Sequence, residues 1–252
     1  MHIDIDRFSN INSQFHKWDE RYKIISILIL IISFSVVKSF YLVLTIPILA
    51  LIMVTISRLP LYFVLKKLKL TLIFFLPLFI LLPISSGGEI FYLIVGIKIY
   101  KIGLHLAISI FLKAISILIC IMIMFGTSRF DRTIKAFYHL KIPEKLIIMI
   151  LFTYRYIYIY MENLRKLNVA LFLQGFKKTS NLRSILVSSS LIGNLLIRCY
   201  DQTEMVYNAM ILRGFNGKLI SQFRFKASKT DLFKAIIIIF ISLLIVGLEI
   251  II

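Results

Sequence analysis

A seven-residue pattern that ends in a polar residue, a glycine and a phenylalanine occurs twice in this 252-residue chain. The copies are Ala170-Leu-Phe-Leu-Gln-Gly-Phe176 and Ala209-Met-Ile-Leu-Arg-Gly-Phe215. Ala209 and Arg213 are four residues apart and so share a helix face. The small side chain permits close backbone approach, and the guanidinium can pair with carboxylates or carbonyl oxygens of a partner. The duplicated pattern therefore predicts two docking points.

The two copies are not equivalent. Gln174 stands where the second copy has Arg213, so the first keeps hydrogen-bonding capacity but lacks the charge and the two-pronged guanidinium. Arginine followed by glycine is also ordinary capping of a helix C-terminus, which is the favoured interpretation for a single copy. Repetition 39 residues apart favours docking instead. The predicted coupling residues are Ala170, Gln174, Gly175, Ala209, Arg213 and Gly214, with Met205 and Lys113 as candidate partner-facing residues.

The composition places the chain in a bilayer. It is 60% hydrophobic, with a mean hydropathy of +0.92, well above soluble domains. Uncharged runs predict about five transmembrane helices, at Ile24–Val37, Ser39–Ser57, Leu70–Gly88, Ile102–Ser128 interrupted by Lys113, and Ala235–Ile252 interrupted by Glu249. The first run is short and could form a tilted hairpin with the second around Lys38. The expected fold class is all-α, a polytopic helical membrane protein.

The charge distribution predicts the orientation. Residues 127–230 hold 17 of the 30 Lys and Arg against 5 of the 12 acids, so this block should be cytoplasmic. The chain then divides into a four-span membrane part at 1–126, cytoplasmic coupling helices at 127–230, and a C-terminal transmembrane helix at 231–252. The N-terminus is expected inside the cell and the C-terminus outside. We expect the chain to remain in the cell (inner) membrane, because no cleavable signal peptide is visible.

The cytoplasmic block is expected to be helical, because its apolar residues recur at helix spacing between turn signals. The predicted helices run from about Asp131 to Leu140, from Glu144 to about Leu173, and from Ser184 to Ile197 with a continuation to Leu212. Both repeated motifs then sit at helix C-termini, ended by Gly175 and Gly214 in the left-handed conformation. The apolar start and tyrosine run of the second helix indicate that it lies along the membrane surface.

Catalytic and metal-binding patterns are missing from the sequence. There is no phosphate-binding GxxxxGK[ST] loop, no HExxH and no GxSxG. The histidines His2, His16, His105 and His139 are scattered without acidic or cysteine companions, and both cysteines are interpreted as packing residues. Lys113 lies inside a predicted span and is a functional candidate, although snorkelling or polar neighbours explain it as well. No metal site or cofactor is predicted.

Several longer motifs resemble a known family, the T components of energy-coupling factor transporters, especially the cobalt/nickel type called CbiQ-like. The resemblance covers most of the chain and rests on the segments Leu140-Lys-Ile-Pro143, Tyr154-Arg-Tyr-Ile157, the Ala170–Phe176 motif, Arg198-Cys-Tyr-Asp-Gln-Thr-Glu204, Val206-Tyr-Asn-Ala-Met210 and Arg213-Gly-Phe-Asn-Gly217. It implies a non-catalytic scaffold whose two helix ends fit grooves on a pair of cytoplasmic ABC-type ATPases. ATPase closure would be transmitted to a separate substrate-binding membrane subunit. Gln174 departs from the family's usual arginine.

Other interpretations stay open at this point. A vitamin-type T component shares the fold and the Arg-Gly ends, so it is the alternative to the metal type. A membrane enzyme with an unrecognised site would start from Lys113 and His105. A third hypothesis is an anchor whose basic block binds anionic lipid or nucleic acid through charge alone. The sharp Ala-to-Gly pattern argues against that, so no nucleic-acid partner is expected.

Overall fold

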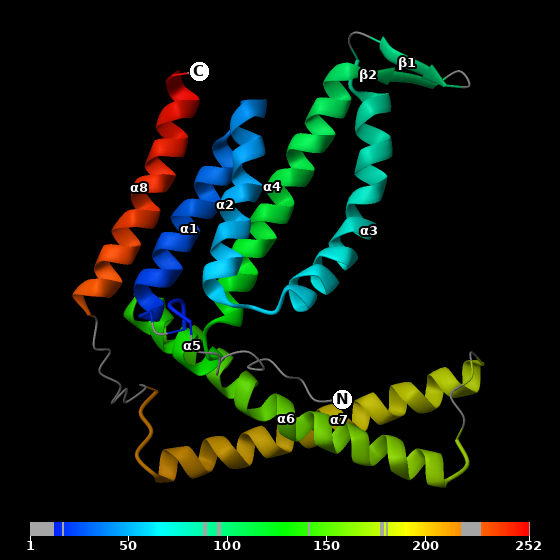
Figure 1. The fold of residues 1–252 in the computed structure, drawn as a ribbon. Coiled ribbons are helices and arrows are strands. Elements are labelled where there is room, and N and C mark those ends of the chain that lie inside the picture. The colour runs from blue at the N-terminus through cyan, green and yellow to red at the C-terminus, as the bar shows by residue number, and fades with distance from the viewer. Residues whose placement is uncertain are drawn as a thin grey trace. The chain divides into compact units, whose positions relative to one another are not determined.

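The computed structural model describes residues 13–16, 18–87, 90–94, 97–140, 142–176, 179, 181–217 and 228–251. Predictions that fall on His2, Gly88, residues 218–227 and Ile252 lie outside these ranges. The described helices are α1 (Glu20–Val36), α2 (Phe40–Ser57), α3 (Leu61–Ser85), α4 (Lys101–Gly126), α5 (Phe130–His139), α6 (Glu144–Leu173), α7 (Leu182–Leu212) and α8 (Lys229–Ile251) (Figure 1). The predicted helical fold class is confirmed.

The chain divides into two compact units. One holds residues 137–223, with α6 and α7, and is called the coupling unit below. The other holds residues 4–136 and 224–252, with α1 to α4 and α8, and is called the membrane unit. The boundary falls inside α5.

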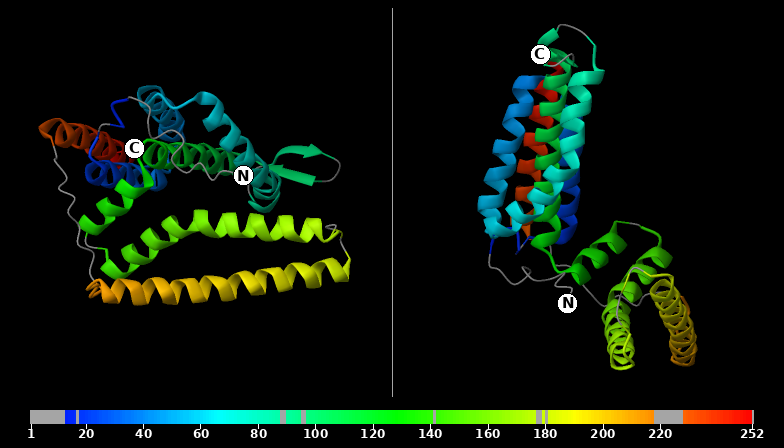
Figure 2. Two further views of the ribbon diagram at one scale, coloured as in Figure 1. Left: turned by 90° about the horizontal axis from the view of Figure 1, so that it is seen from below. Right: turned by 90° about the vertical axis from the view of Figure 1, so that its right-hand side faces the viewer.

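The membrane unit is a bundle organised around α4. This helix packs against α2, α3 and α1, and α1 also packs against α8 (Figures 1 and 2). One face of α1 is buried through Ile24, Ile27 and Phe34, spaced three to seven residues apart as on one side of a helix. The other face is apolar too, with Ile32 62% exposed. A helix that is apolar all round fits a lipid environment.

The candidate spans agree with the predicted number but not fully with its members. By length and composition α2, α4, α7 and α8 are each able to cross a membrane, and α3 as a bent pair would make five. The 17-residue α1 is at the short limit for crossing a bilayer, and it is packed into the bundle. Helix α7 was predicted in the cytoplasmic block, so its apolar length was not anticipated.

Helix α3 begins nine residues earlier than the predicted span from Leu70. Pro60 precedes its first turn, and Lys66, Lys67 and Lys69 lie within it rather than in a loop, because lysine is a good helix former. The helix bends by 43° between Ile73 and Phe75. Pro77 explains the bend, since its ring displaces the carbonyl group of residue 73.

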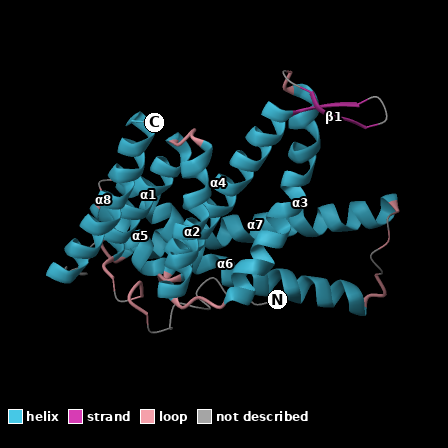
Figure 3. Ribbon diagram, turned by 45° about the horizontal axis from the view of Figure 1, so that its top comes forward, coloured by secondary structure: helices cyan, strands magenta, loops and turns pink. Residues whose placement is uncertain are grey.

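A close approach of α3 and α4 depends on Gly103. A Cβ atom there would lie 2.5 Å from the Leu82 carbonyl oxygen and 2.7 Å from Pro83 Cα, and would also meet Ser86 Oγ. No side chain fits without separating the helices. Between them the chain forms an antiparallel hairpin of β1 (Ile90–Ile94) and β2 (Ile97–Tyr100), the strands of Figure 3. This hairpin was not predicted from the sequence.

Polar contacts tie the membrane helices together at their ends. The Trp18 indole nitrogen donates to the Asp231 carbonyl oxygen (3.0 Å). The fully buried Lys23 donates to the Phe15 carbonyl oxygen (3.3 Å) and to Thr127 Oγ1 (3.2 Å). The Glu249 carboxylate of α8 accepts hydrogen bonds from the backbone N–H groups of Lys38 (2.9 Å) and Ser39 (3.1 Å), just before α2. These contacts hold α1, α2, α4 and α8 in register.

In the coupling unit, α6 and α7 cross one another as an X (Figure 1). The 30 residues of α6 and the 31 of α7 each make a rod about 45 Å long. Their C-termini, which carry the repeated motifs, lie at opposite ends of the X (Figure 1). The predicted bounds of α5 and α6 are confirmed within one residue, and α7 is one continuous helix.

Candidate functional site

Both copies of the repeated pattern fold into the same helix-ending motif. In the first copy the Gly175 N–H donates to the Phe172 carbonyl oxygen (3.0 Å), and the Phe176 N–H to that of Leu171 (3.0 Å). In the second copy Gly214 donates to Ile211 (2.8 Å) and Phe215 to Met210 (3.0 Å). These two bonds define the Schellman motif, which satisfies carbonyl groups that the helix leaves unpaired.

The glycines are required by backbone conformation rather than by space. Gly175 has φ 79° and Gly214 has φ 82°, the left-handed region that glycine adopts without cost. A Cβ atom at either position would meet no atom of the described structure within 4 Å. The sequence prediction that glycine ends both helices in this conformation is therefore confirmed.

The remaining predicted coupling residues lie on exposed surface. Ala170, Gln174, Ala209 and Arg213 are all exposed, and Gln174 and Arg213 occupy the same capping position in their helices. Large apolar side chains flank them, with Leu173 79% and Leu212 88% exposed. Each helix end thus presents an apolar tip beside one polar side chain. Such a tip gains by insertion into an apolar groove.

Met205 extends the second exposed face by one helical turn. It lies four residues before Ala209, and its side chain is 66% exposed. Its flexible thioether can adapt to an uneven partner surface. Its contact with a partner stays a prediction.

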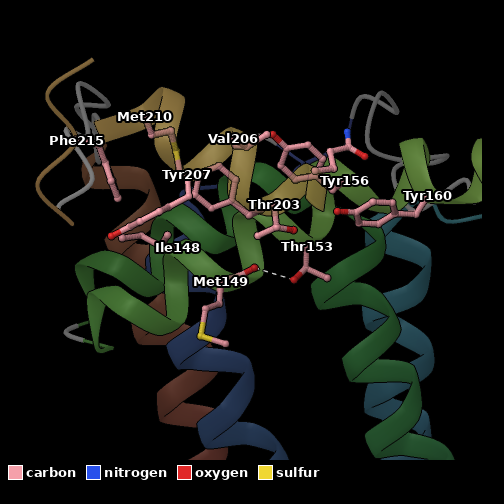
Figure 4. Close-up of a pocket in the computed structure, with 12 residues that line it drawn as sticks. Ile148, Met149, Thr153, Tyr156, Tyr160, Thr203, Val206, Tyr207, Met210 and Phe215 are labelled. Atoms are coloured by element: carbon pink, nitrogen blue, oxygen red, sulfur yellow. Dashed lines mark hydrogen bonds between the residues drawn. The ribbon is translucent and has the colours of Figure 1, made fainter. Parts of the chain in front are cut away.

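The second helix end borders a groove that was not predicted from the sequence (Figure 4). The first half of α6 and the last third of α7 enclose about 410 Å³. The lining residues are Ile148, Met149, Phe152, Thr153, Tyr156, Tyr160, Gln202, Thr203, Val206, Tyr207, Met210 and Phe215. The rings of Tyr156 and Tyr160 lie 6.1 Å apart on one face of α6. The four-residue spacing of these tyrosines indicates that they share one face of a helix. No pattern in the sequence indicates which residues of α7 form the opposite wall.

Phe215 connects this groove to the second motif. It follows Gly214 in the Schellman motif, and both Phe215 and Met210 line the groove (Figure 4). Contact between these two positions is a usual part of the motif. The depression beside the first motif is lined by α6 residues alone, including the ion pair of Glu162 and Lys166 (3.4 Å). The two helix ends therefore share a backbone but not their surroundings.

The other candidates lie in the membrane unit. Lys113 is half-buried in the middle of α4, and its charged neighbours are Glu249 and Lys38. The ring of His105 packs edge-on against Phe40, with centroids 4.3 Å apart. In the part of the chain that the structure describes, no three His, Cys, Asp or Glu side chains are grouped so as to hold a metal ion.

Comparison with known proteins identifies the family. The CbiQ family, described as "Cobalt transport protein", matches residues 12–224. The uncharacterized protein MJ1571 of Methanocaldococcus jannaschii is 24% identical over 97% of this chain and 86% of its own length. The uncharacterized protein MJ1089 of the same organism is 29% identical over 59% of this chain and 56% of its own. The chain therefore belongs to the CbiQ family, the T components of energy-coupling factor transporters, which are non-catalytic, multi-pass membrane components.

Proposed function

We propose that this chain couples two cytoplasmic ABC-type ATPases to a membrane substrate-binding subunit through the ends of α6 and α7. By its family, the chain belongs to a complex with such partners. ATP binding would draw the two ATPases together, and the helix ends held in their grooves would follow. The crossed helices would pass this movement to the substrate-binding subunit.

The observation that carries the proposal is the repetition of one exposed helix ending at two separated sites. Each ending is fixed by the same two backbone hydrogen bonds and the same left-handed glycine. An ending that only stopped a helix would not need Leu173 and Leu212 in solvent, where burial of each would contribute about 2 kcal/mol. Two exposed ends with the same Schellman motif suit two similar partners.

The transported substrate is proposed to be cobalt or nickel. The support is the description of the matching family as a cobalt transport protein, together with the CbiQ-like character of the Arg198–Gly217 segment. A vitamin remains the alternative substrate. Purification of the complex in mild detergent, identification of the associated substrate-binding chain, and competition uptake assays with labelled cobalt, nickel and vitamins would decide between them.

The orientation is also part of the proposal. The excess of lysine and arginine in residues 127–230 supports a cytoplasmic coupling unit, with the N-terminus inside and the C-terminus outside. Labelling of single cysteines introduced at either end, in intact and in permeabilised cells, tests this assignment.

Charge reversal at the second helix end tests the docking function. Arg213→Glu should lower both ATPase co-purification and substrate uptake, because a carboxylate replaces the exposed guanidinium. Arg183→Glu is the matched control, since Arg183 is exposed on the same helix at its opposite end. Full retention of ATPase co-purification and of uptake in Arg213→Glu would overturn the proposal. Equal losses in Arg213→Glu and Arg183→Glu would overturn it as well.

A further inference from the structure

A groove lies on the membrane unit between α1, α2 and α8. Its volume is about 440 Å³, within the range of ligand sites. Its floor includes Leu30 and Trp18, which are 1% and 2% exposed, while Ile52 on α2 and Ile237 on α8 stand as half-exposed rims. A buried floor between exposed rims forms a channel that opens sideways.

The groove is apolar along its length and cationic at one end. Lys234 and Gln14 are its polar lining residues, and all the others are apolar or aromatic. Lys234 is half-buried, and among the described residues none forms a hydrogen bond or ion pair with it. Asp231, three residues earlier, is buried, and its carboxylate accepts from the Ser228 N–H (3.1 Å). The Lys234 ammonium group at the groove mouth is therefore available to pair with an anion.

The cationic end lies where a membrane surface is expected. The polar start of α8, with Lys229 and Asp231, gives way at Ala235 to an uncharged run. Tryptophan and lysine favour this interfacial level, and Trp18 and Lys234 line the groove together here. Ile241, at the far end, is about 10 Å deeper along the helix axis, a third of a hydrocarbon core roughly 30 Å thick.

The dimensions favour an occupant narrower than a helix. A volume of about 440 Å³ spread over about 10 Å of depth gives a mean cross-section of roughly 40 Å². A helix with its side chains is about 10–12 Å across and needs roughly twice that area. A single hydrocarbon chain is narrower than a helix and matches the apolar walls.

We propose that this groove binds an anionic phospholipid, with one acyl chain lying between α2 and α8 over Leu30 and with the phosphate group at Lys234. The membrane supplies the acyl chain, and the lone ammonium group selects the headgroup charge. Which leaflet supplies the lipid rests on the proposed orientation, whereas binding itself does not. Bound lipid would fill the space between α2 and α8.

Native mass spectrometry of the full-length chain tests the site with phosphatidylglycerol or phosphatidylcholine added to the detergent-purified protein. The unaltered chain should prefer phosphatidylglycerol by about fivefold, the effect of one lysine at a membrane surface. Lys234→Gln should abolish this preference, because it removes the charge and keeps the polar tip. Ile238→Trp should lower retention of both lipids, because the larger ring fills the groove.

Two controls make the result specific. Lys229→Gln removes an exposed charge from the same helix outside the groove and should keep the preference. Ile236→Trp adds the same ring on the exposed face of α8 and should keep retention of both lipids. Equal binding of the two lipids by the unaltered chain, or equal losses in Lys234→Gln and Lys229→Gln, would overturn the proposal. Binding of ATPases to the same variants, measured separately, reports on the proposed coupling function.

Discussion

Replacement of Gly214 by alanine tests whether the shape of the second helix end, apart from its charge, governs docking. At φ 82° an L-residue with a Cβ atom costs about 1–2 kcal/mol. No steric contact adds to this figure, because a Cβ atom there meets nothing within 4 Å. The chain would escape the strain only by giving up the Gly214 and Phe215 hydrogen bonds, each contributing about 0.5–1.5 kcal/mol.

The expected result for Gly214→Ala is therefore a five- to thirty-fold weaker association with the ATPases, corresponding to about 1–2 kcal/mol. The assay is equilibrium binding of purified ATPase pair to the chain in detergent, with circular dichroism to confirm that helix content is retained. Gly214→Asn should recover most of the affinity, because asparagine tolerates the left-handed region.

Gly217→Ala is the control for backbone strain. Gly217 has φ 81°, and a Cβ atom there also meets nothing within 4 Å, so the local cost is the same. It lies outside the Schellman hydrogen bonds of the second motif. Undiminished binding by Gly214→Ala, or an equal loss in Gly217→Ala, would refute the reasoning.

Three further predictions address the first helix end and the membrane bundle. Gln174→Arg should tighten ATPase binding about tenfold by adding a charged hydrogen-bond donor, whereas unchanged affinity in the same assay would mean that this end contributes shape alone. Gly103→Ala should lower the melting temperature, because a Cβ atom at position 103 meets atoms of α3. Gly247→Ala should leave the melting temperature unchanged or slightly higher, because a Cβ atom there meets no neighbouring atom. Equal shifts in the two variants would contradict the close approach of α3 and α4 at Gly103. Lys23→Met should lower the free energy of unfolding by about 1–3 kcal/mol, because it leaves the Phe15 carbonyl group unpaired. Faster thiol labelling of the buried Cys120 at elevated temperature would report this loss of stability. Unchanged labelling would count against a stabilising role of Lys23.

Local signals predicted much of the coupling unit, and long-range contacts explain what they missed. Gly175 and Gly214 predicted both helix ends, because capping by a left-handed residue depends on only a few adjacent residues. The groove between α6 and α7 depends on which faces meet where two long helices cross. The tyrosine spacing indicated one wall, but nothing local paired Tyr156 with Tyr207.

The same distinction applies in the membrane unit. The uncharged runs of the sequence predicted most of α2, α4 and α8. The same criterion placed the start of α3 too late, because its lysines extend the helix before the apolar run begins. Glu249 appeared in the sequence as an acid near the end of a span. Its contacts depend on the chain just before α2, where Ser39 forms no side-chain cap. The backbone N–H groups of Lys38 and Ser39 donate to this distant carboxylate (2.9 and 3.1 Å).

The shared Schellman motif of the two helix ends makes the pair an internal comparison. Gln174 and Arg213 occupy the same capping position before a left-handed glycine, although the Gln174 N–H donates to a carbonyl four residues back and the Arg213 N–H to one three residues back. A difference in docking strength between the ends must then come from the side chains or from their surroundings. Gln174→Arg equalises the capping side chain, while the neighbouring pairs Leu171/Met210 and Phe172/Ile211 and the groove beside Phe215 stay unmatched. Any asymmetry that persists in that variant therefore measures the contribution of the flanking apolar residues and the groove together.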